Sequence, residues 1–300
     1  MAIIEVVDLG KRYGPKVAVD EVSFTVEEGE IFGILGPNGA GKTTTVECVE
    51  GMRVPDRGTI RVDGLDPRRD RDALRQVLGV QLQESQLPDR IKVREALDLY
   101  SSFYPDPADW RELMGRLGLE EQRNAEFGKL SGGQKQRLSV ALALVGKPRI
   151  AVLDELTTGL DPQARRDTWD LIEGVRDSGV TVLLVTHFME EAERLCDRLA
   201  VIDAGRVVAI DTPAGLVSRV DSTQRVRFRP STPIDLALFR DLPEVSEARE
   251  HGGRIHLTGH GNLLHAVTSV LARNQVVAAD LRVDQASLDD AFVELTKREK

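Results

Sequence analysis

The sequence predicts an α/β protein with a parallel-sheet core, followed by a small α+β domain. Three observations support this fold class. Short apolar runs alternate with helical segments over the first two-thirds of the chain, which is typical of a parallel sheet covered on both faces. A Gly-rich loop, residues 36–43, joins one apolar run to a helix. After about residue 218 the strand and helix patterns change their order.

The first elements predict a small antiparallel layer. Two β-like runs, AIIEVVDL (2–9) and VAVDEVSFTV (17–26), are separated by polar turns. Such runs between turn residues are typical of paired strands. EIFGILG (30–36) then predicts a buried strand, GKTTTVECVEGM (41–52) a helix and VLGVQLQ (77–83) another short strand.

The middle of the chain changes to helical spacing. Residues 93–119 predict helix, interrupted by Pro105 and Pro107. After residue 130, strand and helix patterns alternate again, which is typical of a parallel sheet covered by helices. The expected segments are a helix at 131–146, a strand at 149–155, a helix at 164–179, a strand at 180–187, a helix at 189–199 and a hairpin at 200–211 about Ala204-Gly205.

A domain boundary is predicted near Ser218. The segments that follow, from TQRVRFR to SLDDAFVELTKRE, have the order β-α-β-β-α-β-α. About 80 residues in that order fit a two-layer α+β domain.

Composition limits the classes of function. Hydrophobic residues make up 41% and charged residues 30%, and the net charge of -9 argues against broad binding to nucleic acid or anionic lipid. No apolar stretch approaches the ~20 residues needed to span a bilayer. The N-terminus has no signal-peptide pattern. Cys48 and Cys196 form no metal spacing, so we expect reduced cytosolic thiols.

The Gly-rich loop predicts a phosphate site. It fits G-x-x-x-x-G-K-[ST] between a predicted strand and a predicted helix. Glycines let backbone N–H groups converge on an anion, and the helix N-terminus adds positive charge. Lys42 can reach the β- and γ-phosphates, and the Thr43 hydroxyl can ligand Mg²⁺. The residues expected to hold nucleotide here are Gly36, Pro37, Asn38, Gly39, Ala40, Gly41, Lys42, Thr43 and Thr44.

Two adjacent acids end the strand at 149–155. Asp154 and Glu155 would repel each other unless a cation lies nearby. Beside a triphosphate and Mg²⁺ they acquire separate roles: Asp154 faces the metal, and Glu155 orients and deprotonates the attacking water. Two solvated acids at a strand end remain the alternative, but the phosphate loop favours catalysis.

The segment Leu130-Ser131-Gly132-Gly133-Gln134 adds a third motif. Together with the phosphate loop and IAVLDE, LSGGQ resembles the signature of ABC-type ATPases, and the likeness covers residues 2 to about 217. The resemblance implies the P-loop NTPase fold with a RecA-like parallel-sheet core. It also implies an ATPase domain at 1–218, with a helical subdomain at about 84–145, and an accessory domain at 219–300.

The resemblance also implies roles for single residues. Tyr13 looks like the aromatic that stacks on adenine, and His187 like the histidine that contacts the γ-phosphate. Gln83 resembles the glutamine that touches Mg²⁺ and the attacking water, with Gln81 a neighbouring candidate. Asp161 resembles the acid that communicates across the dimer. In the family, the segment corresponding to Ser131, Gly132, Gly133 and Gln134 closes the site on the opposite chain.

The function implied is an ATP- and Mg²⁺-dependent ATPase that powers a membrane exporter. The C-terminal ending DLRVDQASLDDAFVELT resembles that of ABC-2-type exporter ATPases, such as those for drug resistance. A homodimer is expected at the inner face of the cell membrane, joined to a transmembrane permease on a separate chain. The alternative is a soluble ABC-family ATPase that remodels a macromolecular complex. A small-molecule kinase would leave LSGGQ unexplained.

Leu156 is a departure from the family pattern, which usually has proline there. Proline would restrict Glu155 to extended geometry. We therefore expect slightly looser placement of Glu155 in this chain, with no catalytic atom lost.

Overall fold

The computed structural model describes residues 1–81, 87–219, 224–284 and 287–297 of the chain. These residues form two units, Met1–Pro213 and Ala214–Lys300, whose boundary lies five residues before the predicted one. Among the described residues, no helix combines the length and the apolar character that crossing a membrane requires.

The first unit contains a three-stranded antiparallel sheet of order β2-β1-β4. Its strands are β1 Ala2–Tyr13, β2 Lys16–Glu27 and β4 Arg57–Val62. Apolar side chains at alternate positions, such as Ile4, Val6 and Phe24, are buried in the main core. The predicted antiparallel layer is therefore confirmed, and β4 is the strand that the sequence patterns did not single out.

The second sheet of this unit has the order β5-β6-β7-β3-β8-β9. The first five strands pair in parallel, and β9 runs antiparallel to β8. Every residue of β3, β6 and β7 is buried, as expected for parallel strands covered on both faces. The strands are β3 Ile31–Leu35, β5 Leu78–Gln81, β6 Ile150–Asp154, β7 Thr181–Thr186, β8 Arg198–Asp203 and β9 Arg206–Asp211.

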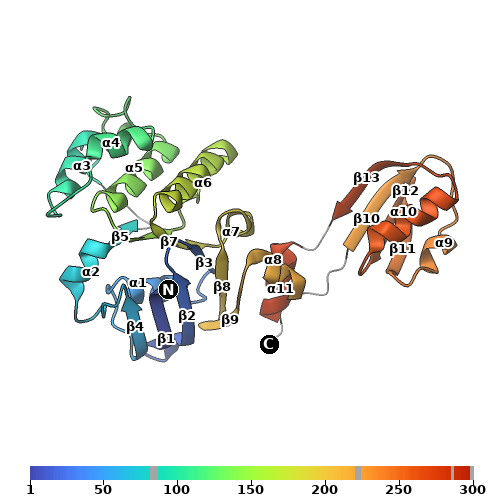
Figure 1. The fold of residues 1–300 in the computed structure, drawn as a ribbon, viewed down its shortest axis with the longest axis horizontal. Helices are drawn as coiled ribbons and strands as arrows, with labels where there is room; N and C mark the ends of the chain where they lie inside the picture. The colour runs from blue at the N-terminus through green and yellow to red at the C-terminus, as the bar shows by residue number, and fades with distance from the viewer. Residues whose placement is uncertain (82–86, 220–223, 285–286, 298–300) are drawn as a thin grey trace. The chain divides into compact units, whose positions relative to one another are not determined.

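Helices complete the first unit. Those placed between the strands are α1 Lys42–Val49, α2 Arg71–Val77, α6 Pro162–Asp177 and α7 Met189–Leu195. A separate helical region has its own apolar core and contains α3 Val93–Ser101, α4 Trp110–Arg116, the short 3-10 helix Phe127–Lys129 and α5 Gly132–Leu144. Figure 1 shows α3, α4 and α5 grouped together. The guanidinium groups of Arg111 and Arg123 lie 4.3 and 5.6 Å from the Trp110 ring.

The second unit contains a four-stranded antiparallel sheet of order β11-β12-β10-β13. Helices α9 and α10 cover one face, where Val226, Phe228, Ile255 and Leu257 are buried. The predicted order β-α-β-β-α-β-α is confirmed, and α8 Pro213–Arg219 precedes it. The elements are β10 Gln224–Pro230, α9 Ala237–Arg240, β11 Val245–His251, β12 Arg254–Gly259, α10 Leu263–Arg273, β13 Ala278–Asp284 and α11 Leu288–Lys297.

The opposite face of this sheet carries a row of basic residues. Cross-strand pairing places Arg249 opposite His256, His256 opposite Arg227, and Arg227 opposite Arg282. Partners that lie directly opposite each other project to the same face. One basic residue from each of the four strands therefore lies in line across the sheet.

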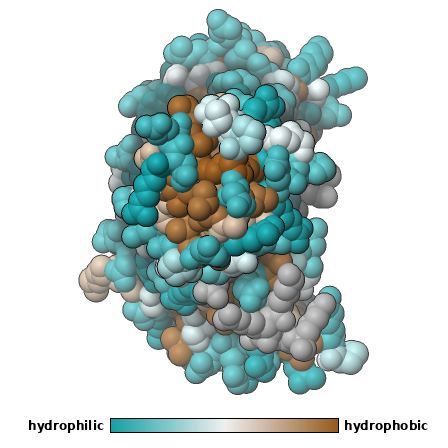
Figure 2. Space-filling view, turned by 90° about the vertical axis from the view of Figure 1, so that its right-hand side faces the viewer, coloured by the Kyte–Doolittle hydropathy of each residue, from teal (hydrophilic) through white to brown (hydrophobic). Residues whose placement is uncertain are grey.

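Apolar side chains also reach the surface of the second unit. Leu238 of α9 is 40% exposed and Leu264 of α10 is 37% exposed. Figure 2 shows apolar residues, in brown, enclosed by hydrophilic residues in teal.

Candidate active site

Three neighbouring strands bring the predicted motifs to one edge of the parallel sheet. Leu35, the last residue of β3, lies opposite Thr186 of β7, and Asp154 of β6 lies opposite Val185 of β7. Parallel strands end at the same edge, so the residues that follow them gather there. The phosphate loop, Glu155 and His187 each follow one of these strands.

The phosphate loop runs from β3 into α1. A β-carbon on Gly36 would lie 2.2 Å from the Ile202 carbonyl oxygen. A β-carbon on Gly41 would lie 2.3 Å from the Ala18 carbonyl oxygen, and Gly41 has φ +102°. Only glycine fits these two positions. Gly41 caps α1 without a side-chain hydrogen bond, so the first turn of the helix keeps backbone N–H groups for an anion.

Lys42 folds back over this loop. Its ammonium donates to the carbonyl oxygens of Gly36 at 2.8 Å and Pro37 at 3.2 Å. The side chain is buried, and burial lowers the pKa of Lys42 from its usual value although Glu155 and Asp154 oppose this. A buried ammonium held by two carbonyl oxygens is a ready partner for an incoming polyanion.

Asp154 is a buried carboxylate at the end of β6. Burial, with the neighbouring Glu155 charge, raises the pKa of Asp154 to about 6, and Lys42 acts in the opposite direction. Its Oδ1 is buried and has no hydrogen-bond partner within the described part of the chain. Its backbone N–H donates to Oε1 of Gln81 at 3.1 Å. A buried carboxylate oxygen without a protein partner is suited to binding a cation.

Glu155 and His187 lie in contact. His187 Nδ1 is 3.1 Å from Glu155 Oε1. The Glu155 backbone N–H donates to the Val185 carbonyl at 2.9 Å, and Glu155 has φ +49°, a conformation that is strained for a residue with a side chain. The Glu155 backbone is thus held by the end of β7, and its carboxylate contacts the imidazole.

Leu156 has a structural role of its own. Its side chain is completely buried. Glu155 is left-handed rather than extended, so the extended geometry associated with a following proline is not the geometry seen here. Burial of Leu156 anchors the turn that carries Glu155.

The LSGGQ segment begins α5 with a capping box. Gln134 N–H donates to Ser131 Oγ at 3.3 Å, and Ser131 N–H donates to Gln134 Oε1 at 2.9 Å. A β-carbon on Gly132 would lie 3.4 Å from the Leu160 side chain, and one on Gly133 would lie 3.4 Å from Ala164. Within one chain, therefore, the segment starts a helix beside the beginning of α6.

Asp161 caps that neighbouring helix. Its Oδ1 accepts from the backbone N–H groups of Gln163 at 2.9 Å and Ala164 at 3.0 Å. These bonds lower the pKa of Asp161 from its usual value. The structure gives Asp161 a local capping function, and its role across a dimer stays a prediction.

The structure gives less information about the remaining predicted site residues, which are Tyr13, Thr43 and Gln83. Tyr13 ends β1, is 41% exposed, and has Lys11 Nζ 5.7 Å from its ring centre. An exposed ring is available for stacking. Thr43 is exposed in the first turn of α1. Gln83 lies outside the described residues.

Two acids escaped sequence analysis, and a third group was only a second choice there. Gln81 was only a neighbouring candidate, yet it bonds the Asp154 backbone. Burial, then the Asp154 charge, raises the pKa of Glu50 to about 8. Glu191 is completely buried, accepts from Trp169 Nε1 at 3.2 Å, and has a pKa raised by burial. Glu50 directly follows α1 and Glu191 lies on α7, both with other acids nearby in the sequence, so no sequence signal distinguishes them from solvated acids.

Comparison with known proteins finds similar chains. The family described as ABC transporter matches residues 19–158. The Nod factor export ATP-binding protein I of Burkholderia orbicola (strain AU 1054) is 47% identical over 308 residues, covering 100% of this chain and 98% of the relative. The protein of the same name from Paraburkholderia xenovorans (strain LB400) is 40% identical, covering 99% and 98%.

Solved structures resemble the chain over a smaller share of its length. The ATP-binding subunit of an ABC transporter is 28% identical with a TM-score of 0.66, covering 72% of this chain and 92% of that one. CbiO1 from Clostridium perfringens, part of an ABC transporter complex, is 27% identical with a TM-score of 0.66, covering 73% and 94%. A dimeric ATP-binding cassette bound to ADP and Pi is 25% identical with a TM-score of 0.62, covering 70% and 98%.

Proposed function

The chain belongs to the ABC transporter family as an ATP-binding subunit that hydrolyses ATP, and from that premise we propose that it powers a membrane exporter as an ATP-sandwich homodimer. One observation supports the proposal most directly. Lys42, Asp154, Glu155 and His187 all lie at or just after the ends of three adjacent parallel strands, at the same edge of the sheet. A phosphate cradle, a free carboxylate and a carboxylate–imidazole pair are the parts that phosphoryl transfer to water requires.

Mg²⁺ fits the donors at this edge. The Asp154 Oδ1 atom has no hydrogen-bond partner in the described part of the chain, and the exposed Thr43 hydroxyl lies in the first turn of α1. Gln83 would complete the oxygen set that the sequence predicts. When bound, Mg²⁺ supplies charge neutralisation at the β- and γ-phosphate oxygens.

Hydrolysis then depends on positioning by this chain's own residues. The loop N–H groups and Lys42 hold the phosphates. Glu155 takes a proton from water while the water oxygen attacks the γ-phosphorus and the bond to the ADP oxygen breaks. His187, 3.1 Å from Glu155, orients that carboxylate and steadies the γ-phosphate. Tyr13 stacks on adenine.

The second chain completes each site. In the proposed dimer, Ser131, Gly132, Gly133 and Gln134 of one subunit face the γ-phosphate held by the other, and Asp161 lies at the interface. Support comes from the helix start at Ser131, whose N–H groups suit an anion, and from the dimeric cassette among the similar structures.

Export is the proposed direction of transport. Relatives named as Nod factor export proteins align with the whole chain, including its second unit. We place the dimer at the inner face of the cell membrane, in an exporter of the ABC-2 type with a transmembrane permease on a separate chain. The second unit serves as its accessory domain.

Glu155→Gln tests the catalytic assignment. The variant is expected to bind ATP and accumulate a dimer on size exclusion, while turnover falls about 100-fold or more because general-base catalysis is lost. Glu190→Gln, an exposed acid on α7, is the matched control and should keep wild-type turnover. Wild-type turnover in Glu155→Gln would refute the general-base role.

The exporter assignment has a separate test. Purification from native membranes should recover a membrane protein that stimulates ATP hydrolysis. Recovery of a ribosomal, DNA-bound or other complex in its place would favour the remodelling ATPase.

A further inference from the structure

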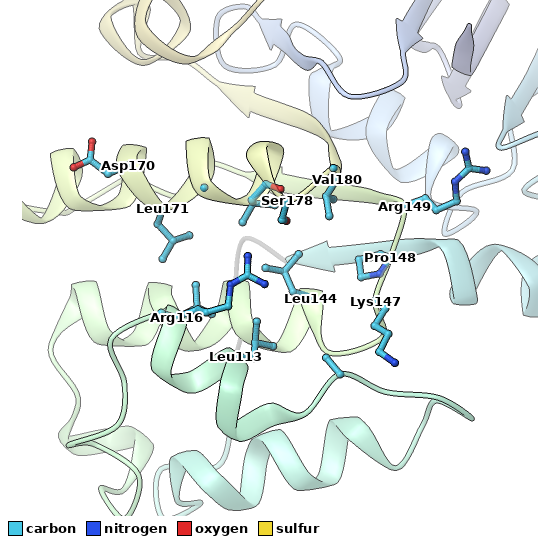
Figure 3. Close-up of a pocket in the computed structure, with 15 residues that line it drawn as sticks. Leu113, Arg116, Leu144, Lys147, Pro148, Arg149, Asp170, Leu171, Ser178 and Val180 are labelled. Atoms are coloured by element: carbon cyan, nitrogen blue, oxygen red, sulfur yellow. Dashed lines mark hydrogen bonds between the residues drawn. The ribbon is translucent and has the colours of Figure 1, made fainter.

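A cavity of about 460 Å³ lies away from the phosphate loop, between α4, the turn after α5 and the C-terminal half of α6 (Figure 3). Its volume is within the range of small-molecule sites. Most of its wall is apolar, contributed by Ala108, Leu113, Leu117, Leu144, Pro148, Leu171, Val175 and Val180. An apolar molecule that enters the cavity would be removed from contact with water on several of its sides.

Three cations also line the cavity, and two of them are already paired. Lys147 lies 2.9 Å from the Asp106 carboxylate, and Arg149 binds Glu28 at 2.6 Å and also Asp63. In Figure 3 both side chains point away from the leucines. These two cations are therefore structural.

Arg116 is the third cation and differs from the other two. Figure 3 shows its guanidinium pointing from α4 toward α6, between Leu144 and Leu171. The one lining carboxylate, Asp170, points outward and binds Arg194 at 2.5 Å. Arg116 is exposed, and across the described ranges no side-chain hydrogen bond or ion pair engages its guanidinium. The cavity thus combines an apolar wall with one uncommitted positive charge.

Gly174 lines the cavity on its α6 side. It lies inside α6, where glycine is less favourable than alanine by about 1 kcal/mol. A β-carbon there would meet nothing within 4 Å, so packing does not require glycine. Gly174 is exposed and lines the cavity, so a larger side chain at this position can enter it.

We propose that this cavity binds a small amphiphilic anion, with its apolar body against Leu113, Leu144 and Leu171 and its anionic head on the Arg116 guanidinium. Guanidinium recognises carboxylate in a bidentate geometry, and the apolar wall favours anions that carry an apolar body. The positive charge of Arg116 and the apolar wall of the cavity together define the chemical class of the ligand.

The position of the cavity gives binding a regulatory consequence, which rests on the proposed function. Three of its neighbouring elements lead to the candidate active site. Helix α5 begins at the Ser131 cap, β6 ends at Asp154, and α6 begins at the Asp161 cap. A ligand held between the far ends of these elements restrains their relative movement, so we expect it to lower ATP turnover.

Octanoate, titrated into the full chain without nucleotide and followed by calorimetry, tests binding. One octanoate per chain is expected, and Arg116→Met should weaken it about tenfold or more through loss of the charged hydrogen bonds. Neutral 1-octanol should bind wild type and Arg116→Met equally. Arg111→Met, on the same helix but outside the lining, should leave octanoate binding unchanged.

Gly174→Leu provides a second variant, which fills the cavity and should abolish octanoate binding. Absence of octanoate binding in the wild type, or equal binding in all variants, would overturn the proposal. If Gly174→Leu does not fold, octanoate binding by Arg116→Met is sufficient to test the proposal. Because no ATP is present, the result stands whether or not the ATPase assignment survives.

The regulatory consequence is measured separately. Octanoate is expected to lower ATP turnover of the wild type and to leave that of Gly174→Leu unaffected. Equal inhibition of both would place the effect outside this cavity.

Discussion

The two units of the chain present their charged residues in opposite ways. In Met1–Pro213, the candidate catalytic groups gather at the end of a parallel sheet, next to loops. In Ala214–Lys300, basic residues lie across the face of an antiparallel sheet. Parallel strands point their ends to a common edge, whereas antiparallel strands share only their faces. Sheet direction therefore decides whether charged residues from several strands gather at one edge of the sheet or line up across its face.

The balance of charge follows the same division. The residues after Pro213 include twelve basic and twelve acidic side chains, so the whole formal charge of -9 belongs to the first unit. The first unit also buries acids. Burial is the main cause of the raised pKa values of Glu50, Asp154 and Glu191. In the second unit, hydrogen bonds from Ser287 lower the pKa of Asp290.

Truncation of Leu156 should give the largest effect on stability. Leu156→Ala removes a fully buried side chain beside the candidate catalytic acids and should cost about 2–5 kcal/mol of unfolding free energy. Leu281→Ala, at a position 40% exposed in the second unit, should cost less than about 1 kcal/mol. Chemical denaturation of both variants provides the comparison. Equal costs would mean that the buried turn is no more constrained than the outer strand.

A partly buried acid of the first unit should make stability depend on pH. The folded-state pKa of Glu50, about 8, lies above its ordinary value of 4.5, so the folded chain holds a proton that the unfolded chain releases. Stability from this group is therefore complete below the ordinary value and is lost as pH rises toward 8.

Glu50→Gln removes this dependence. We expect the variant to be more stable than wild type by roughly 2 kcal/mol at pH 8, with a smaller difference at pH 5. Thermal unfolding at the two pH values measures it. A difference that does not change with pH would show that Glu50 titrates normally.

The smallest expected effect concerns the basic row. Arg227 and Arg282 lie directly opposite each other, and like charges in such pairs are destabilising. Arg282→Thr should stabilise the chain by about 0.5 kcal/mol. Arg254→Thr should have the opposite sign, because Arg254 lies 3.5 Å from the Asp280 carboxylate. Salt should reduce both effects, and a loss of stability in Arg282→Thr would show that the row is not repulsive.

The sequence predicted those parts of the fold that depend on local patterns. Continuous apolar runs identified β3, β6 and β7, and Gly36 to Lys42 identified the loop between β3 and α1. The order of elements in the second unit also followed from local patterns. Sheet order did not, because β7 lies between β3 and β6 through contacts that are distant along the chain.

The candidate site shows the same limit. Asp154, Glu155 and His187 could be identified by their places at strand ends. The bond from Asp154 to Gln81 and the burial of Glu50 depend on how distant segments pack. The left-handed conformation of Glu155 was not predicted either, because Leu156 removes the restriction that a proline would impose without specifying another conformation.

The two tryptophans of the chain make the first unit optically distinct from the second. Trp110 begins α4 under the guanidinium of Arg111, and Trp169 donates its indole N–H to the buried Glu191. Both lie in Met1–Pro213, so the second unit contributes no indole emission. Intrinsic fluorescence of the unmodified chain therefore reports on the ATPase unit alone, and Trp169 reports on the surroundings of a buried carboxylate.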